Sequence, residues 1–264
     1  MQEGMILGAR RTATGTTRGL LTPLSTTDLR ASSLDGADPS SRPGQALQVS
    51  EGRGNPEPRT GDYDPRLFTV GHSNWPFPRF VELVKGAGID LLLDVRSRPA
   101  SGRNPHFSQP VFETQLRGEG IGYLFLGEEL GGRPEDPSLY RPNGAVDYQA
   151  CRKSFAFRAG IERVAQEAQR HKVALVCAEE DPLDCHRLLM ISPALVAAGL
   201  TPVHLRGNGQ LEPQRAVEDR LLAATGFGHF ANDLLFPEAR NEALEKAYDL
   251  QAERAAFRVD PPAV

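Results

Sequence analysis

Two cysteines stand eight positions apart in an acidic segment whose residue types suit thiol chemistry. The segment runs Cys177-Ala-Glu-Glu-Asp-Pro-Leu-Asp-Cys-His-Arg187. The dipole at the start of a helix favours a cysteine thiolate, and the charge of Arg187 would add to this effect at Cys185. The neighbouring carboxylates act in the opposite direction, because they raise a thiol pKa unless they turn outward or pair with arginines.

Three roles stay open for this segment. The first is catalytic or redox chemistry at the thiols. The second is metal binding by Cys177, Cys185 and His186, although their spacing matches no standard zinc pattern. The third is structural, with one cysteine at the end of a strand and the other serving as a small residue at the start of a helix.

An arginine-bearing segment without acidic residues lies between Val95 and Phe112. Its arginines are Arg96, Arg98 and Arg103. A guanidinium fork binds carboxylate or phosphate oxygens in a bidentate manner that lysine cannot copy, which favours an anion or phosphate site. The alternative is that these arginines pair with structural carboxylates such as Asp94, Glu128 and Glu129, or face solvent.

His72 follows a predicted strand directly, where it is placed either to act as a general base or to hydrogen-bond the loop backbone. Together these segments predict a catalytic set of His72, Cys177, Glu179, Cys185 and His186, in which His72 and Glu179 move protons. The predicted substrate-binding set is Ser73, Arg96, Arg98, Arg103, Asn104, Arg133, Asp181 and Arg187.

Short apolar runs alternate with amphipathic stretches from Leu67 onward, a pattern typical of β-α units around a parallel sheet. Strands are predicted over 67–71, 89–95, 122–126, 172–178 and 202–205, and helices over 76–86, 110–117, 157–171, 185–198, 213–224 and 237–257. We therefore expect an α/β fold: a three-layer Rossmann-like domain with a mainly parallel sheet of about five strands, plus C-terminal helices. The segments rich in chemical side chains all follow strands, so they should meet at the carboxyl edge of the sheet.

The composition divides the chain of 264 residues, which has a net charge of −4. No Phe, Tyr, Trp, His, Cys or Lys occurs in the first 60 residues, so a core is expected only further on. We predict a disordered or loosely ordered tail over 1–66, the α/β domain over 67–206 and a helical C-terminal extension packed on it over 207–264.

The mild acidity argues against a broad nucleic-acid-binding or membrane-surface protein. No apolar stretch reaches the roughly 18 residues needed to cross a bilayer. Three cysteines cannot form a disulfide framework, so a reducing, cytoplasmic location is expected.

Five motifs in this sequence resemble those of the domain of unknown function 488 family. They are Thr69-Val-Gly-His-Ser73, Asp94-Val-Arg-Ser97, Arg103-Asn-Pro105, Leu130-Gly-Gly-Arg133 and the segment from Cys177 to Arg187. The resemblance spans about residues 67 to 206. It implies a three-layer α/β domain with the signature residues clustered at one edge of the sheet, and it supplies no activity.

The leading hypothesis is an enzyme that acts on an anionic, phosphate-bearing substrate, either a nucleotide or a nucleic-acid fragment or end, as a thiol- or acid/base-dependent transferase or hydrolase. The alternatives are a non-catalytic nucleotide or nucleic-acid binding module and a metal-dependent site at Cys177, Cys185 and His186. The cofactor is unknown. A dinucleotide or ATP-hydrolysis role is disfavoured, because the sequence has neither G-x-G-x-x-G after the first strand nor a P-loop. No protein partner can be deduced.

Overall fold

A six-stranded sheet forms the centre of the computed structural model, which describes residues 63–231 and 237–259. The strands are β1 (Leu67–Gly71), β2 (Leu91–Asp94), β3 (Gly122–Phe125), β4 (Val173–Cys177), β5 (Val203–Leu205) and β6 (Leu211–Pro213), in the order β3-β2-β4-β1-β5-β6. Every neighbouring pair is parallel except β5 and β6. The predicted α/β class with a mainly parallel sheet is confirmed.

The predicted number of strands is wrong by one, because the sequence analysis missed β6. This strand has three residues and ends on Pro213, where the helical pattern predicted the start of a helix. It pairs with β5 through a tight turn, in which the Arg206 amide donates to the Gln210 carbonyl at 2.9 Å. The Rossmann-like topology is not confirmed either. In dinucleotide-binding folds the first strand pairs with the second, whereas here β4 lies between β1 and β2.

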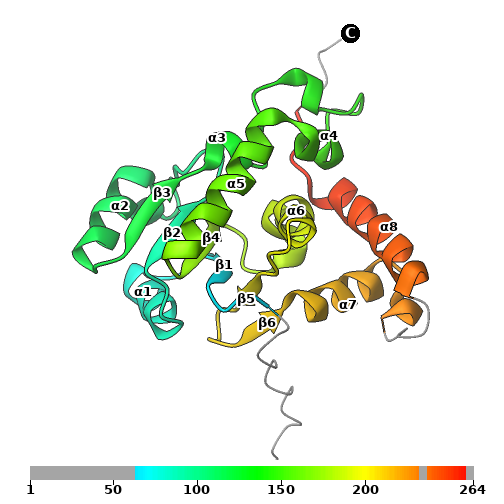
Figure 1. Cartoon of the computed structure of the whole chain (residues 1–264). Helices are drawn as coiled ribbons and strands as arrows, with labels where there is room; N and C mark the ends of the chain where they lie inside the picture. Colours follow the sequence, from blue (N-terminus) through cyan, green and yellow to red (C-terminus); the bar gives the residue numbers. More distant parts are fainter. Residues whose placement is uncertain (1–62, 232–236, 260–264) are drawn as a thin grey trace, which may run out of the picture. The chain divides into compact units, whose positions relative to one another are not determined.

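Helices cover both faces of the sheet because its buried strands are apolar on both sides. Helices α1 (Phe77–Gly86) and α2 (Gln109–Gly118) pack on one face, and α5 (Phe155–Arg170) and α6 (Ser192–Ala197) on the other (Figure 1). Alternate residues of β1 and β4 enter the two cores: Phe68 and Val176 face α1 and α2, and Leu67 and Leu175 face α5 and α6.

The helix predicted over 185–198 is divided in the structure. A 3-10 turn over Pro182–Asp184 leads into a π-helix over Arg187–Ile191, and α6 begins only at Ser192. Single π-turns inside helices occur frequently at functional sites. Two short helices that were not predicted, α3 (Gly127–Leu130) and α4 (Tyr148–Lys153), complete the same end of the sheet.

The C-terminal helices α7 (Gln214–Ala224) and α8 (Pro237–Ala255) bury apolar side chains in the core of the α5 side. After α8 the chain returns to the sheet edge, where the Val146 amide donates to the Phe257 carbonyl at 3.0 Å. None of the helices in the described ranges is long and apolar enough to span a bilayer. The tail predicted over 1–66 lies outside the described residues, apart from its last four positions.

Candidate functional site

Two sulfurs and one imidazole meet where β4 ends. Cys177 is the last residue of β4, and the turn over Pro182–Asp184 brings Cys185 and His186 back beside it. The two Sγ atoms and Nδ1 of His186 all lie within 4.8 Å of one another. His186 Nδ1 is 3.7 Å from Sγ of Cys177 and 3.8 Å from Sγ of Cys185.

The orientation of the His186 ring is fixed by contacts on its other side. Its Nε2 donates to the carbonyl oxygen of Val95 at 2.9 Å, so Nδ1 is the nitrogen that faces the sulfurs. Gly132 packs closely against His186, and a Cβ added there would be 2.9 Å from Cγ of His186. Gly132 of the Leu130-Gly-Gly-Arg133 motif therefore allows close packing on the imidazole, whereas Gly131 packs against Gly127 and Ser97.

The two thiols have opposite electrostatic character. Burial opposes ionisation of Cys185, but a hydrogen bond from the Cys177 thiol and the charges of Arg187 and His186 lower its pKa well below the usual value. Bonding to Cys185 and burial raise the pKa of Cys177, and its Sγ also lies 2.9 Å from Oε2 of Glu179. Burial acts to lower the pKa of His186, yet the adjacent Cys185 thiolate and Glu179 raise it overall.

Arg187 lies behind this cluster and does not line the cavity. Its side chain is 1% exposed. Its guanidinium donates to the main-chain carbonyls of Glu179 and Glu180, the latter at 2.6 Å, and its Nε has no partner among the described residues. Arg187 thus closes the loop that carries the two cysteines.

Arg96 is occupied by the protein itself. Its guanidinium forms a bidentate pair with Asp94, Nε to Oδ1 at 2.8 Å and Nη2 to Oδ2 at 2.5 Å, and its Nη1 donates to the carbonyl of Phe107 at 2.9 Å. The Tyr123 hydroxyl also donates to Asp94, at 2.8 Å. Arg96 therefore pairs with a structural carboxylate, which was one of the alternatives for this arginine.

His72 is buried directly behind Arg96. Burial and the Arg96 charge lower the pKa of His72 to about 4, so its ring is neutral at physiological pH. Its Nδ1 donates to the Ser73 carbonyl at 2.8 Å, and the ring stacks on Phe107 at 4.1 Å between centroids. These contacts are those of the loop-bonding alternative for His72, although the residue also lines the cavity described next.

A cavity of about 300 Å³ opens over the cluster at the carboxyl edge of the sheet. Of the predicted residues, those that line it are His72, Arg96, Arg98, Arg133, Cys177, Glu179 and His186. Arg98 and Arg133 are exposed, and no carboxylate pairs with either among the described residues. The guanidinium of Arg133 lies over the Phe257 ring at 4.4 Å.

The remaining predicted residues lie outside the cavity lining. Arg103 is exposed, and Asn104 joins two loops through a 2.8 Å bond to Asn74. The Ser73 backbone has a left-handed φ of 48°. Asp181 accepts from Arg220 at 2.9 and 3.0 Å, which lowers its pKa to about 2 against the effect of burial. Cys185 lies beneath the surface of the cavity.

Sequence reasoning left several lining residues out of the predicted site, among them the exposed carboxylate of Asp184. Tyr148 comes from α4, Phe257 and Ala255 come from the end of the C-terminal extension, and Ser97 and Ser101 flank the predicted arginines. The serines lie inside the predicted anion-binding segment and could have been predicted from the sequence. Tyr148 and Phe257 carry no sequence signal, because only tertiary packing brings them to the cysteines.

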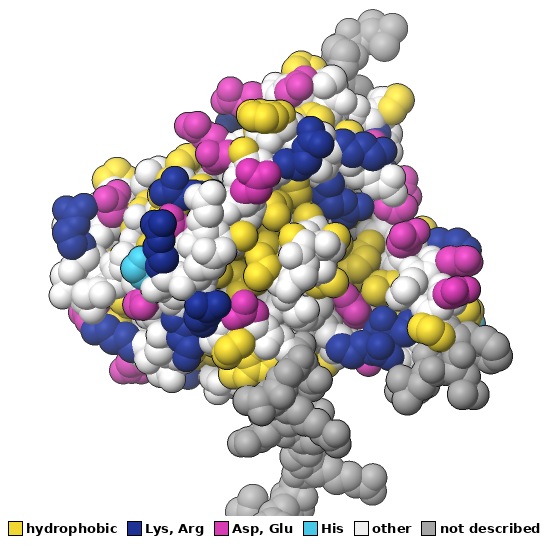
Figure 2. All heavy atoms as spheres, viewed as in Figure 1, with side chains coloured by type: hydrophobic (Ala, Val, Ile, Leu, Met, Phe, Trp, Pro, Cys, Tyr) yellow, Lys and Arg dark blue, Asp and Glu magenta, His cyan; other side chains and the backbone are white. Residues whose placement is uncertain are grey.

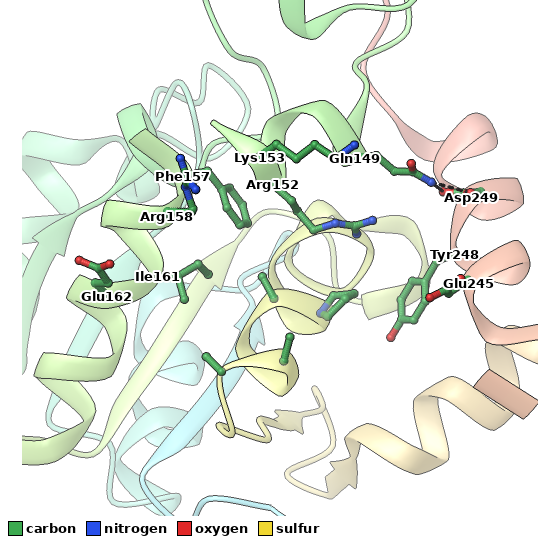
Figure 3. Close-up of a pocket in the computed structure, with 14 residues that line it drawn as sticks. Gln149, Arg152, Lys153, Phe157, Arg158, Ile161, Glu162, Glu245, Tyr248 and Asp249 are labelled. Carbon is green, nitrogen blue, oxygen red and sulfur yellow. Dashed lines mark hydrogen bonds between the residues drawn. The ribbon is translucent and has the colours of Figure 1, made fainter. Parts of the chain in front are cut away.

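A second, larger cavity of about 700 Å³ lies away from the cluster, between α4, α5, α6 and α8. Figure 2 shows apolar side chains exposed at the centre of this face with charged side chains around them, and Figure 3 shows Arg152 and Phe157 on one side and Tyr248 on the other. No cysteine, histidine or serine lines it. The chemistry is therefore concentrated in the smaller cavity.

Comparison with known proteins gives one finding. Residues 76–192 match the family described as Domain of unknown function DUF488. No curated protein and no solved structure matches the chain. The matched span contains both cysteines and every predicted arginine, whereas His72 and Ser73 precede it.

Proposed function

We propose that this chain, whose residues 76–192 match the DUF488 family, is an enzyme. It hydrolyses an anionic, phosphate-bearing substrate or transfers a group from it. The substrate class is a nucleotide or a nucleic-acid fragment or end. The reaction takes place in the cavity at the carboxyl edge of the sheet, the usual ligand position in open α/β folds.

The observation that carries this proposal is that arginines without ion-pair partners line the same cavity as side chains that can do chemistry. Arg98 and Arg133 line the same cavity as Cys177, Glu179 and His186, and neither guanidinium forms an ion pair with a described carboxylate, although Glu179 and Asp184 share the cavity. Exposed arginines at a cavity bind phosphate oxygens in a bidentate manner. The anion is therefore held beside the sulfurs and the imidazole.

The cavity residues take different parts in this proposal. Arg98 and Arg133 bind the phosphate, while Arg96 and His72 form a rigid wall, because their polar atoms are largely bonded within the protein. Glu179 is the residue that moves protons, since its carboxylate lies 2.9 Å from the Cys177 sulfur and lines the cavity. The Phe257 and Tyr148 rings offer the aromatic surface on which a base stacks.

Location in a reducing compartment belongs to the same proposal. All three cysteines are free, and Cys177 and Cys185 lie close together without a disulfide. Dithiols of this kind persist in the cytoplasm, where glutathione and thioredoxin keep thiols reduced.

The test uses a panel of nucleotides and short end-phosphorylated oligonucleotides. Calorimetry measures their binding, and phosphorus NMR measures their turnover. Replacing Arg98 or Arg133 by Ala should weaken binding about tenfold or more, because a hydrogen bond to a charged group contributes roughly 1.5–3 kcal/mol. Arg103→Ala is the matched control: an exposed arginine of the same segment that does not line the cavity.

Two results would contradict the proposal. Equal affinity of the wild type and the Arg98→Ala, Arg133→Ala double variant would remove the anion site. A ligand that binds through these arginines and is always recovered unaltered would favour the non-catalytic binding module instead.

A further inference from the structure

The two nitrogen-to-sulfur distances at the end of β4 are close to those of a metal site, and the two sulfurs lie within 4.8 Å of each other. Tetrahedral zinc has bonds of about 2.3 Å to sulfur and about 2.0–2.1 Å to nitrogen, which set a sulfur and a nitrogen ligand about 3.5 Å apart and two sulfurs about 3.8 Å apart. Nδ1 of His186 lies 3.7 and 3.8 Å from the two sulfurs. We propose that Cys177, Cys185 and His186 bind one zinc ion, with its fourth coordination position open to the cavity.

Adjacent ligands become possible because the backbone changes conformation between them. Cys185 is extended, with φ −131° and ψ 139°, whereas His186 is helical, with φ −60° and ψ −22°. This change brings two consecutive side chains to the same side. It also explains why the spacing resembles no standard zinc pattern, although the donor atoms converge in space.

The groups around the donors are those expected of the outer shell of a zinc site. A metal-binding histidine usually donates its other ring N–H to a carbonyl or carboxylate, and His186 Nε2 does so to Val95 at 2.9 Å. The Arg187 amide lies 3.4 Å from Sγ of Cys185 and donates to it. Both contacts orient the donors before an ion arrives.

The ligand chemistry favours zinc over other common ions. Two thiolates and one imidazole suit zinc or copper, whereas magnesium and calcium prefer oxygen ligands. Three protein ligands with an open fourth position are typical of catalytic zinc, and two cysteines with one histidine are a known set of this kind.

The open coordination position gives the ion a role in the proposed reaction. This role rests on the proposed function, whereas the metal site itself does not. Cys177 and His186 line the cavity with Glu179, so the ion would supply an activated water on the side of the cavity to which Glu179 belongs. Glu179 would take the proton of this water, and the hydroxide would attack the phosphorus atom held by Arg98 and Arg133. The bond from phosphorus to the leaving oxygen would break, and the leaving alcohol would take the proton back from Glu179.

The experiment uses the full-length chain, purified under a reductant and without chelators. We expect about one equivalent of zinc by elemental mass spectrometry. After the zinc is exchanged for cobalt(II), we expect absorption bands of a tetrahedral site with thiolate-to-cobalt charge transfer. Cys177→Ser, Cys185→Ser and His186→Gln should each weaken cobalt binding by at least about 100-fold, because even outer-shell changes cost 10–100-fold.

Cys151→Ser is the matched control, because Cys151 is buried but belongs to no such cluster among the described residues. It should keep the full equivalent and the same spectrum. If a ligand variant does not fold, the cobalt spectrum of the wild type still decides, since it reports thiolate ligation directly. Absence of both metal and cobalt bands after reconstitution of the reduced chain would overturn the inference, as would a Cys177–Cys185 disulfide formed in place of metal binding.

The outcomes for the ion and for the proposed function can be separated. The Arg98→Ala, Arg133→Ala double variant should keep its zinc while losing affinity for the phosphate ligand. A chain that binds the anion normally but holds no metal would overturn only the zinc site, and a zinc-loaded chain with no affinity for anions would overturn only the proposed function.

Discussion

Nη1 of Arg96 lies 3.1 Å from Nε2 of His72 and donates a hydrogen bond to it. A guanidinium has only donors, so His72 accepts at Nε2 and carries its proton on Nδ1, which donates to the Ser73 carbonyl. Because Arg96 also holds Asp94, the three side chains form one buried network beneath the cavity. Substitutions in this network should therefore mainly lower the free energy of unfolding, with a smaller direct effect on the reaction in the cavity.

Arg96→Ala should strongly destabilise the protein. Asp94 is fully buried, and among the described residues removal of Arg96 leaves its carboxylate with only the Tyr123 hydroxyl and the amide of residue 96 as donors. Breaking a buried ion pair in this way costs about 3–5 kcal/mol of unfolding free energy. Urea denaturation measures the loss. Arg103→Ala, at an exposed position, should change stability by about 0.5 kcal/mol or less, and equal effects of the two variants would contradict the assignment of Arg96 as a structural residue.

Gly132→Ala should disturb the His186 ring. The added methyl would lie 2.9 Å from Cγ and 3.0 Å from Nδ1 of His186, so the imidazole must shift from its position. We expect a loss of about 1–3 kcal/mol of unfolding free energy, typical of overpacking, together with a shift of the His186 ring signals in NMR. Gly118→Ala is the control, since nothing lies within 4 Å of a Cβ there. An unchanged His186 signal in Gly132→Ala would count against close packing of the two residues.

His204 should make stability depend on pH. It is buried between Thr69, 2.8 Å from Nδ1, and Gln214, 2.9 Å from Nε2, and burial lowers its pKa to about 3. Between pH 6.5 and about 3 the unfolded chain binds a proton that the folded chain does not. The unfolding free energy therefore falls with decreasing pH over this window, by roughly 1.4 kcal/mol per pH unit for this group.

Denaturant titrations at several pH values test this slope. His204→Gln should reduce it, although His72, with its pKa near 4, contributes in the same direction and leaves part of the dependence. The exposed His229 supplies the control, and His229→Gln should keep the wild-type slope. A slope that His204→Gln leaves unchanged would show that His204 does not drive it.

Much of the fold was predictable because its strands are apolar runs between turn signals. The bounds of β1 match the predicted 67–71, and its five residues are buried, as a strand with helices on both faces requires. Strand β6 was not predictable in the same way, because Leu211–Pro213 is held by pairing with β5 rather than by an apolar pattern of its own. The π-helix after His186 is likewise set by packing, since Arg187–Ile191 are all buried.

The candidate site was predictable to the level of the sheet edge. Strand-end reasoning brought Cys177, His186 and Arg98 to one cavity, because parallel strands deliver their following loops to the same side. It could not separate Arg98 from Arg96, since the two differ only in whether the side chain turns inward to Asp94 or outward to the cavity. Nor could it supply Phe257, which reaches the site through pairing of residues 144–146 with the end of the chain.

Arg187→Leu should loosen the loop that carries the cysteines. The Arg187 guanidinium is the donor that satisfies the carbonyls of Glu179 and Glu180, and an unsatisfied buried polar group costs about 1–3 kcal/mol. For two such carbonyls we expect a loss of roughly 2–6 kcal/mol of unfolding free energy and faster amide hydrogen exchange in the loop after Cys177. Arg163→Leu removes an exposed guanidinium that pairs with Glu167 on α5, and it should alter neither quantity appreciably. If Arg187→Leu exchanged its loop amides at the wild-type rate, the side chain would not be what holds Cys185 and His186 against Cys177.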